Sequence, residues 1–149
     1  MLIIQHTVKT RAKPEAIWKI WEDVSNWNSW DHGIEYSCID GPFIEGTTGK
    51  LKPKGGPLVH TKLTSVEPLK RFVDESKLIF AKIIVSHDLK VANGATEVTH
   101  QIEMKGPLAF LFAFLIGRKM KKNLPEEMRA MVEKAEKNER CFLEEGQRV

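Results

Sequence analysis

A chain of 149 residues, 42% hydrophobic and 29% charged, has the composition of a soluble globular protein and the length of a single domain, residues 1–149. The net charge of +3, with no zinc-finger spacing and no arginine-rich arm, argues against nucleic-acid binding. Cys38 and Cys141 lie far apart, which fits a reduced cytoplasmic setting better than a disulfide scaffold. No signal peptide is expected, and the longest apolar run, Leu108–Ile116, is far shorter than the roughly 20 residues of a membrane span. We therefore expect a cytoplasmic protein.

The first thirty residues predict one strand and two short helices. Leu2–Thr10 is rich in β-forming residues and should be the first strand. Pro14 suits the first position of a helix, and a second, shorter helix should carry Trp27 and Trp30. All four tryptophans fall between Trp18 and Trp30. This clustering predicts an aromatic core, and Trp27 and Trp30 are also candidates for the mouth of a pocket.

From Ile34 onward, glycine and proline separate short runs of β-forming residues, which predicts an antiparallel meander. The expected strands are residues 35–40, 47–54, 59–67 and 71–78. In the last of these, Asp74 and Glu75 are adjacent, so a strand would point them to opposite faces. One of them could reach an interior histidine, but solvent exposure is the expected position.

Residues 81–106 give the clearest prediction, a β-hairpin. Asn93-Gly94 is the strongest short signal for a two-residue type I′ turn, because both central residues need a positive φ. Apolar residues alternate on both sides of the turn, which indicates two strands, each with one apolar face. The turn fixes a register in which His87 lies opposite His100 and Lys90 lies opposite Glu97.

His87 and His100 are therefore the main candidate catalytic residues. If both point inward, burial lowers their pKa and keeps at least one imidazole neutral near pH 7, able to take a proton from a carbon beside a carbonyl group. The alternative is a structural pair, bonded to each other or to a neighbouring hydroxyl. A metal site is not expected, because zinc takes three or four protein ligands and a third would have to come from Cys38, Asp74 or Glu75.

Gly106-Pro107 ends the last strand and begins a long helix. Its first turns, Leu108–Ile116, are apolar all round, so they should be buried on more than one side or cover a cavity. Pro125 should kink or divide the helix, and the chain beyond about Asn138 should fray. The basic residues that follow the apolar run form either a solvated face or a transient contact with anionic lipid headgroups: Arg118, Lys119, Lys121 and Lys122.

Several short motifs occur in a specific order between residues 3 and 136. They are Pro14-Glu15-Ala16-Ile17-Trp18, the Trp27–Trp30 pair, Asp40-Gly41-Pro42-Phe43, Gly46-Thr47-Thr48-Gly49, Arg71-Phe72-Val73-Asp74-Glu75, His87, Gly94–His100 and Gly106-Pro107-Leu108. Each motif is weak alone, but with this order and spacing the sequence resembles the START/Bet v 1-like (SRPBCC) superfamily, in particular its polyketide cyclase/dehydrase and lipid transport branch.

The resemblance implies an α+β helix-grip fold, in which a curved antiparallel sheet of about seven strands wraps around a long C-terminal helix, with two short helices after the first strand. It also implies a deep cavity between sheet and helix for apolar or amphipathic small molecules. No cofactor is expected. The residues expected to bind the ligand are Trp27, Trp30, Phe72, Val85, His87, Leu89, Val98, His100, Ile102, Met104, Leu111, Phe112 and Leu115.

Three functions are compatible with this fold, because a fold constrains function weakly. The first is a carrier or sensor of a lipid, polyketide or aromatic metabolite, with His87 and His100 orienting a polar end of the ligand. The second is a cofactor-free cyclase, dehydratase or isomerase in which one of these histidines is the general base. The third is a protein-interaction module whose interior is only a packed core.

Overall fold

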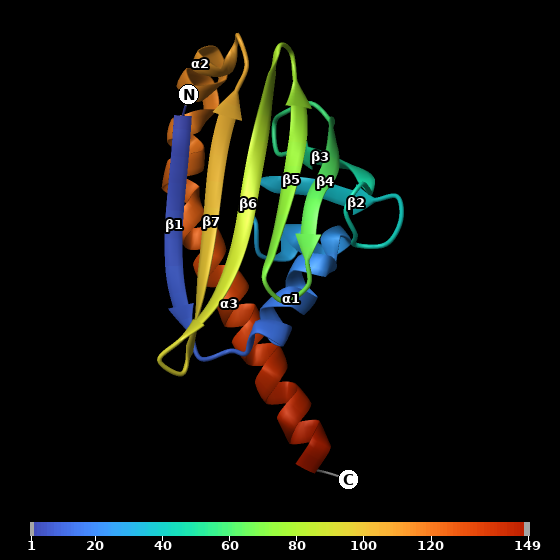
Figure 1. The fold of residues 1–149 in the computed structure, drawn as a ribbon, viewed down its shortest axis with the longest axis vertical. Helices are drawn as coiled ribbons and strands as arrows, with labels where there is room; N and C mark the ends of the chain where they lie inside the picture. Colours follow the sequence, from blue (N-terminus) through green and yellow to red (C-terminus); the bar gives the residue numbers. More distant parts are fainter. Residues whose placement is uncertain (1, 148–149) are drawn as a thin grey trace.

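The computed structural model describes residues 2–147 as one curved sheet with helices against it (Figure 1). The strands are β1 (Leu2–Thr10), β2 (Ile34–Ile39), β3 (Thr48–Pro53), β4 (Val59–Glu67), β5 (Arg71–Leu78), β6 (Ala81–Ala92) and β7 (Ala95–Lys105). The helical segments are α1 (Pro14–Glu22), the 3₁₀ segment η1 (Val24–Ser29), α2 (Ala109–Phe112), the π-helical segment η2 (Ala113–Gly117) and α3 (Arg118–Gln147).

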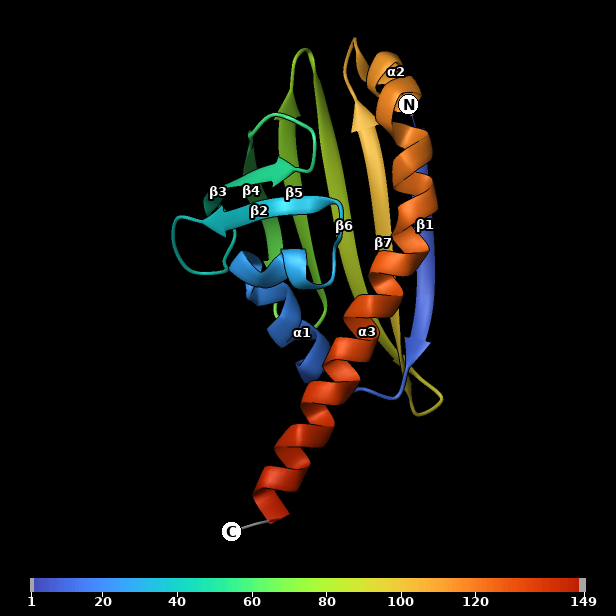
Figure 2. The ribbon, with the colours of Figure 1, turned by 180° about the vertical axis from the view of Figure 1, so that it is seen from behind.

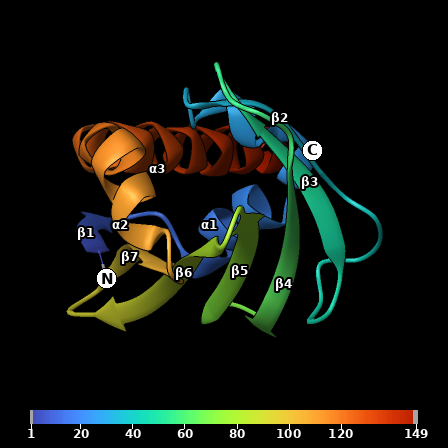
Figure 3. The same ribbon diagram turned by 90° about the horizontal axis from the view of Figure 1, so that it is seen from above.

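The seven strands pair antiparallel in the order β1-β7-β6-β5-β4-β3-β2. Seen from above, the sheet curves beneath α3, and β2 and β3 rise beside the helix (Figure 3). Seen from behind, α3 runs along the concave face, and α1 and the β2–β3 pair lie next to it (Figure 2). The helix-grip fold predicted from the sequence is confirmed.

The hairpin formed by β6 and β7 has the predicted turn and register. Asn93 and Gly94 have φ values of 53° and 76°, as a type I′ turn requires. His87 lies opposite His100, and Lys90 lies opposite Glu97. The ion pair that forms at this point, however, joins Glu97 to the ammonium group of Lys9 on β1, at 3.8 Å. The hairpin thus places both histidines on the inner face of the sheet.

The four tryptophans form the aromatic core that their clustering predicts. All four are buried, and Trp21 is fully enclosed. The Trp21 indole packs edge-on against Phe72 at a ring distance of 5.2 Å, and its Nε1–H points at Met131 Sδ on α3 at 3.0 Å. The indole N–H of Trp27 donates to the carbonyl of Trp21 at 2.9 Å. These contacts join α1, η1, the sheet and α3 into one core.

The segment Leu108–Ile116 does not have the predicted burial on several sides. Phe110 is 71% exposed and Phe114 is 83% exposed, while Ala109 is buried. The physical reason is position: α2 and η2 follow the end of β7 and lie at the end of the sheet, where only one side of the helix meets protein (Figure 1).

The C-terminal helix is longer and more continuous than expected. Pro125 lies inside α3 and does not divide it, and the chain departs from α-helical geometry earlier, in η2. Beyond Asn138, where fraying was predicted, α3 continues to Gln147. Here the residue that precedes α1 makes a contact: the Lys13 backbone N–H donates to the Glu139 carboxylate at 2.9 Å. None of the helices between residues 2 and 147 is both long and apolar enough to cross a membrane.

Candidate functional site

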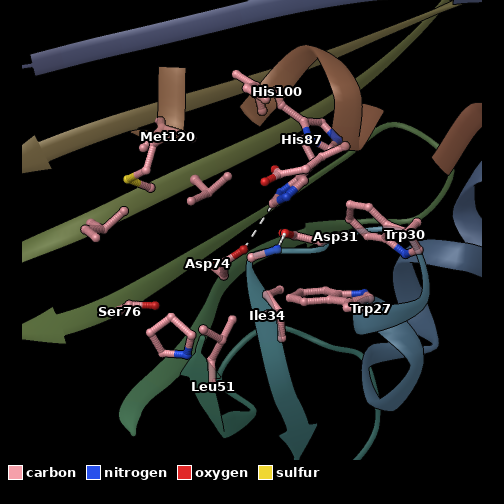
Figure 4. Close-up of a pocket in the computed structure, with 17 residues that line it drawn as sticks. Trp27, Trp30, Asp31, Ile34, Leu51, Asp74, Ser76, His87, His100 and Met120 are labelled. Atoms are coloured by element: carbon pink, nitrogen blue, oxygen red, sulfur yellow. Dashed lines mark hydrogen bonds and ion pairs between the residues drawn. The ribbon is translucent and has the colours of Figure 1, made fainter. Parts of the chain in front are cut away.

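A cavity of about 210 Å³ lies between the inner face of the sheet and the first half of α3 (Figure 4). Its walls come from η1, the loop after it, five strands and α3. The lining residues are Trp27, Trp30, Asp31, Gly33, Ile34, Leu51, Pro53, Asp74, Ser76, Ile83, Val85, His87, His100, Ile102, Met120, Leu124 and Glu127. The walls are mostly apolar, and the polar groups gather around the two histidines (Figure 4).

The structure brings six of the predicted ligand-binding residues to this cavity: Trp27, Trp30, Val85, His87, His100 and Ile102. The other seven lie elsewhere. Phe72, Val98 and Met104 are buried core residues, and Leu89 is partly buried against the core. Leu111 and Leu115 are 40% and 61% exposed, and Phe112 is half-buried beside them, because α2 and η2 lie past the end of the sheet.

His87 and His100 meet edge to face, with ring centroids 4.5 Å apart and planes at 73°. His87 also stacks on Phe72 at 3.8 Å, with the two rings nearly parallel. Cross-strand register explains both contacts, since His87 on β6 pairs with Phe72 on β5 and with His100 on β7. The aromatic ring of Phe72 therefore fixes the plane of the His87 imidazole.

Both imidazoles are neutral at pH 7. Burial lowers the pKa of His87 well below its usual range, and the neighbouring His100 adds to this effect. Burial, with a contribution from His6, lowers the pKa of His100 to about 3. A neutral imidazole can donate one hydrogen bond and accept another, so the pair can bind a polar group that carries no charge.

Asp74 lies beside His87 in the cavity. Its Oδ2 is 3.8 Å from His87 Nδ1, which is too long for a direct hydrogen bond (Figure 4). Burial raises the pKa of Asp74 to about 7. Asp74 is thus buried, and the prediction that it is exposed to solvent is wrong. The alternative, in which this carboxylate lies beside an interior histidine, agrees with the structure. Glu75 points to the other face of the sheet, where it meets Lys82 at 2.9 Å.

A second acidic pair, which the sequence analysis missed, joins the loop after η1 to α3. Asp31 accepts the backbone N–H of Gly33 at 2.9 Å, and its carboxyl is hydrogen-bonded to that of Glu127. Burial raises the pKa of both groups, and the charge of Asp31 raises that of Glu127 further. The sequence carries no signal for this pair, because Glu127 is one of many acidic residues on a charged helix and its partner is distant in the chain.

Three buried nitrogen atoms in the cavity wall have no hydrogen-bond partner among the residues that the structure describes: Trp30 Nε1, His87 Nδ1 and His100 Nε2. Leaving a buried polar group unpaired costs roughly 1–3 kcal/mol. All three atoms belong to residues that line the cavity, where hydroxyl and carbonyl groups of a ligand would be suitable partners for them. No group of three or more histidine, cysteine, aspartate or glutamate side chains within residues 2–147 is arranged to hold a metal ion.

The fold and the cavity together define a helix-grip protein with an internal cavity between the sheet and α3. The sequence matches the model of the family described as "Polyketide cyclase / dehydrase and lipid transport" over residues 1–136. The chain therefore belongs to this family, as the resemblance predicted. No functionally curated protein matches the sequence.

Solved structures with low sequence identity share the fold. A hypothetical protein of Helicobacter pylori, jhp0584, is 14% identical with a TM-score of 0.76, covering 90% of this chain and 88% of that one. A START superfamily protein of Mycobacterium smegmatis is 15% identical with a TM-score of 0.66, covering 88% and 97%. The Aha1 protein of Colwellia psychrerythraea, solved as a dimer, is 17% identical with a TM-score of 0.64, covering 89% and 94%.

Proposed function

We propose that this protein binds a hydrophobic or amphipathic small molecule in the cavity between the sheet and α3, as a carrier or sensor. The observation that carries the proposal is the cavity itself, with apolar walls and three unpaired buried nitrogen atoms in one region. Its volume of about 210 Å³ is below the roughly 300–1,000 Å³ of pockets for drug-sized ligands. The site therefore suits a compact lipid, polyketide or aromatic metabolite, or one end of a longer molecule.

The two sides of the cavity suggest how such a ligand would lie. Ile83, Val85 and Met120 provide an apolar wall on one side, and the indole rings of Trp27 and Trp30 line another. The polar end of the ligand would lie between His87 and Asp74, whose 3.8 Å separation leaves both groups free to bond to it. An uncharged polar end fits best, because both histidines are neutral.

A second candidate function is cofactor-free acid–base catalysis of the cyclase, dehydratase or isomerase type, in which Asp74 would be the general base in place of His87 or His100, the candidates from the sequence. The observation that favours catalysis is the pKa of Asp74, about 7, because a proton-transfer group works best when its pKa lies near the working pH. His100, with a pKa of about 3, is a weaker base at neutral pH. In this function Asp74 would exchange a proton with the substrate, and His87 would hold the polar group beside it.

Native mass spectrometry of freshly purified protein tests the binding proposal, and a pair of variants locates the site. Ile83 lines the cavity, whereas Ile84 is next to it on the same strand and points to the opposite face. We expect a bound mass that disappears on denaturation, that is lost in Ile83→Trp and that is kept in Ile84→Trp. A ligand-free wild-type mass, or equal loss in both variants, would contradict a cavity-bound ligand.

Substitution of the polar residues separates a carrier from an enzyme. For a carrier, His87→Leu removes the hydrogen-bonding imidazole nitrogens and weakens binding of the extracted ligand by roughly tenfold. For an enzyme, Asp74→Asn keeps binding and lowers turnover by roughly 10²–10⁴-fold. Binding is measured through intrinsic tryptophan fluorescence, since Trp27 and Trp30 line the cavity, and turnover through the change in ligand mass over time.

The proposal includes transient contact with membranes. Arg118, Lys119, Lys121 and Lys122 begin α3 and are all exposed. Met120 lies between them in sequence and points into the cavity. One turn of α3 thus presents charge outward and an apolar side chain to the site, which would place the cavity close to a lipid surface that the basic residues contact.

A further inference from the structure

A group of large apolar side chains is exposed at one end of the molecule. We call it the apolar end surface; it consists of Ile79, Phe80, Phe110, Leu111, Phe114 and Leu115. Ile79 and Phe80 form the turn between β5 and β6, and the others lie on α2 and η2, at the same end in both side views (Figures 1 and 2). Phe80, Phe110 and Phe114 are 74%, 71% and 83% exposed. Clustered exposure of this kind marks an interaction surface.

The turn and the helix are joined, so the apolar end surface has a defined shape. The backbone N–H of Leu108 donates to the carbonyl of Phe80 at 3.1 Å, which ties the turn to the start of α2. Phe110 and Phe114 are four residues apart and share one face of the helical segment. Phe80 has a φ of 51°, a backbone conformation that bulky residues rarely adopt. The fold therefore keeps a phenylalanine exposed at a backbone cost.

Basic residues flank the apolar end surface on two sides. On the sheet side, Lys77, Lys82 and Lys105 lie opposite one another across β5, β6 and β7. Like charges placed opposite each other destabilise a sheet, so this row needs an explanation other than stability. Glu75 and Glu103 pair with Lys82 and Lys105 but leave Lys77 free of any ion pair among the described residues. On the helix side lies the basic cluster that begins α3: Arg118, Lys119, Lys121 and Lys122.

We propose that the apolar end surface inserts into the interface of an anionic membrane while the lysines and arginine on both sides contact lipid headgroups. Apolar side chains framed by basic residues match the two layers that such a membrane presents, an apolar interior beneath negative headgroups. This inference rests on the proposed membrane contact and extends it, from charge alone to insertion of named side chains. It does not depend on which ligand the cavity binds.

Vesicle flotation of the full chain tests this docking. The probes are vesicles of phosphatidylcholine alone and vesicles of phosphatidylcholine mixed with phosphatidylglycerol in equal parts. We expect binding to the mixed vesicles only, weakened by high salt. The double variant Phe110→Ser/Phe114→Ser should lose roughly tenfold or more of this binding, since it removes two inserting rings. Phe142→Ser is the matched control, because Phe142 is 70% exposed at the far end of α3.

Each outcome decides the proposal. Absence of wild-type binding to mixed vesicles overturns it, as does equal loss in Phe142→Ser. If Phe110→Ser/Phe114→Ser leaves vesicle binding unchanged and Lys119→Glu/Lys122→Glu abolishes it, the protein contacts the membrane through charge alone. That result overturns insertion. If light scattering shows that the wild type forms dimers and that the double variant does not, the apolar end surface binds a second copy of the chain instead of a membrane. Circular dichroism establishes that the variants are folded, and native mass spectrometry reports ligand binding separately, so failure of docking and failure of the cavity proposal are distinguishable.

Discussion

The cavity and the apolar end surface depart from the usual distribution of residues in opposite directions. In the cavity, Asp74, His87 and His100 are polar side chains buried without direct hydrogen bonds between them. At the apolar end surface, Phe110 and Phe114 are aromatic side chains left in solvent. Folding alone favours neither arrangement, because buried polar groups need partners and large apolar patches need cover. Each region therefore fits a partner from outside the chain, a small molecule in one case and a membrane in the other.

The two regions also differ in what holds them in place. The cavity groups are set by cross-strand register, by the stacking of Phe72 on His87 and by packing against α3. The apolar end surface rests on a turn and on short helical segments beyond the end of the sheet. Substitutions of the buried side chains around the cavity should therefore change stability, whereas substitutions of Phe110 and Phe114 should change membrane binding and leave stability nearly unaltered.

The largest expected effect comes from the same change, phenylalanine to alanine, made once in the core that supports the cavity and once at the apolar end surface. Phe72 is fully buried among Trp18, Trp21 and His87, so Phe72→Ala should lower the free energy of unfolding by roughly 3–5 kcal/mol. Phe110→Ala should change it by no more than about 0.5 kcal/mol. Urea denaturation followed by fluorescence measures both. Similar losses in the two variants would remove the contrast between the regions.

The next effect concerns pH. Because the pKa of Asp74 is raised from 3.8 to about 7 on folding, the folded protein binds more protons than the unfolded chain between these values. Asp74 therefore makes the protein less stable as the pH rises through this window, with the loss complete above about pH 7. Asp74→Asn removes the ionisation and should be more stable than the wild type at about pH 8, by up to roughly 4 kcal/mol, with little difference near pH 4.

The comparison of variant with wild type isolates Asp74 from its neighbours. The lowered pKa values of His87 and His100 act in the opposite direction, since they remove stability as the pH falls below 6.5, and they are present in both proteins. The raised pKa of Glu127 is also common to both. Ser76→Ala is the control, because it changes a cavity residue that carries no ionisable group. A stability difference for Asp74→Asn that does not vary with pH would contradict the assignment.

Much of the fold could be predicted from the sequence, because the decisive signals are local. Asn93-Gly94 fixes the turn, the alternation beside it fixes the register, and so the contact between His87 and His100 follows from sequence alone. The same reasoning places Val85 and Ile102 on the inner face. In each case the prediction needs only the chain on either side of one turn.

The parts that could not be predicted depend on contacts between distant segments. The pairing of Asp31 with Glu127 requires the position of α3 over the loop after η1, which no periodicity encodes. Leu111 and Leu115 were assigned to the cavity because an apolar run usually turns inward, but the sheet ends before this helix begins. An apolar pattern predicts that a face will be covered and does not specify whether protein or lipid covers it.

The smallest effect sharpens the contrast at the apolar end surface by separating stability from binding. Lys77 lies opposite Lys82, so Lys77→Glu replaces a repulsive cross-strand pair with an attractive one. We expect thermal unfolding at low salt to show a gain of up to roughly 1 kcal/mol, which high salt removes. The same variant should bind phosphatidylglycerol vesicles several-fold less, because it removes positive charge beside the inserting residues.

Lys137→Glu, the same change at an exposed site toward the C-terminal end of α3, should leave vesicle binding unaltered. If Lys77→Glu lowers stability, or if both variants lose the same vesicle binding, the lysine row has no special part in docking. If Lys77→Glu raises the stability of the protein and lowers its binding to vesicles, the row of Lys77, Lys82 and Lys105 favours membrane contact and reduces the stability of the sheet.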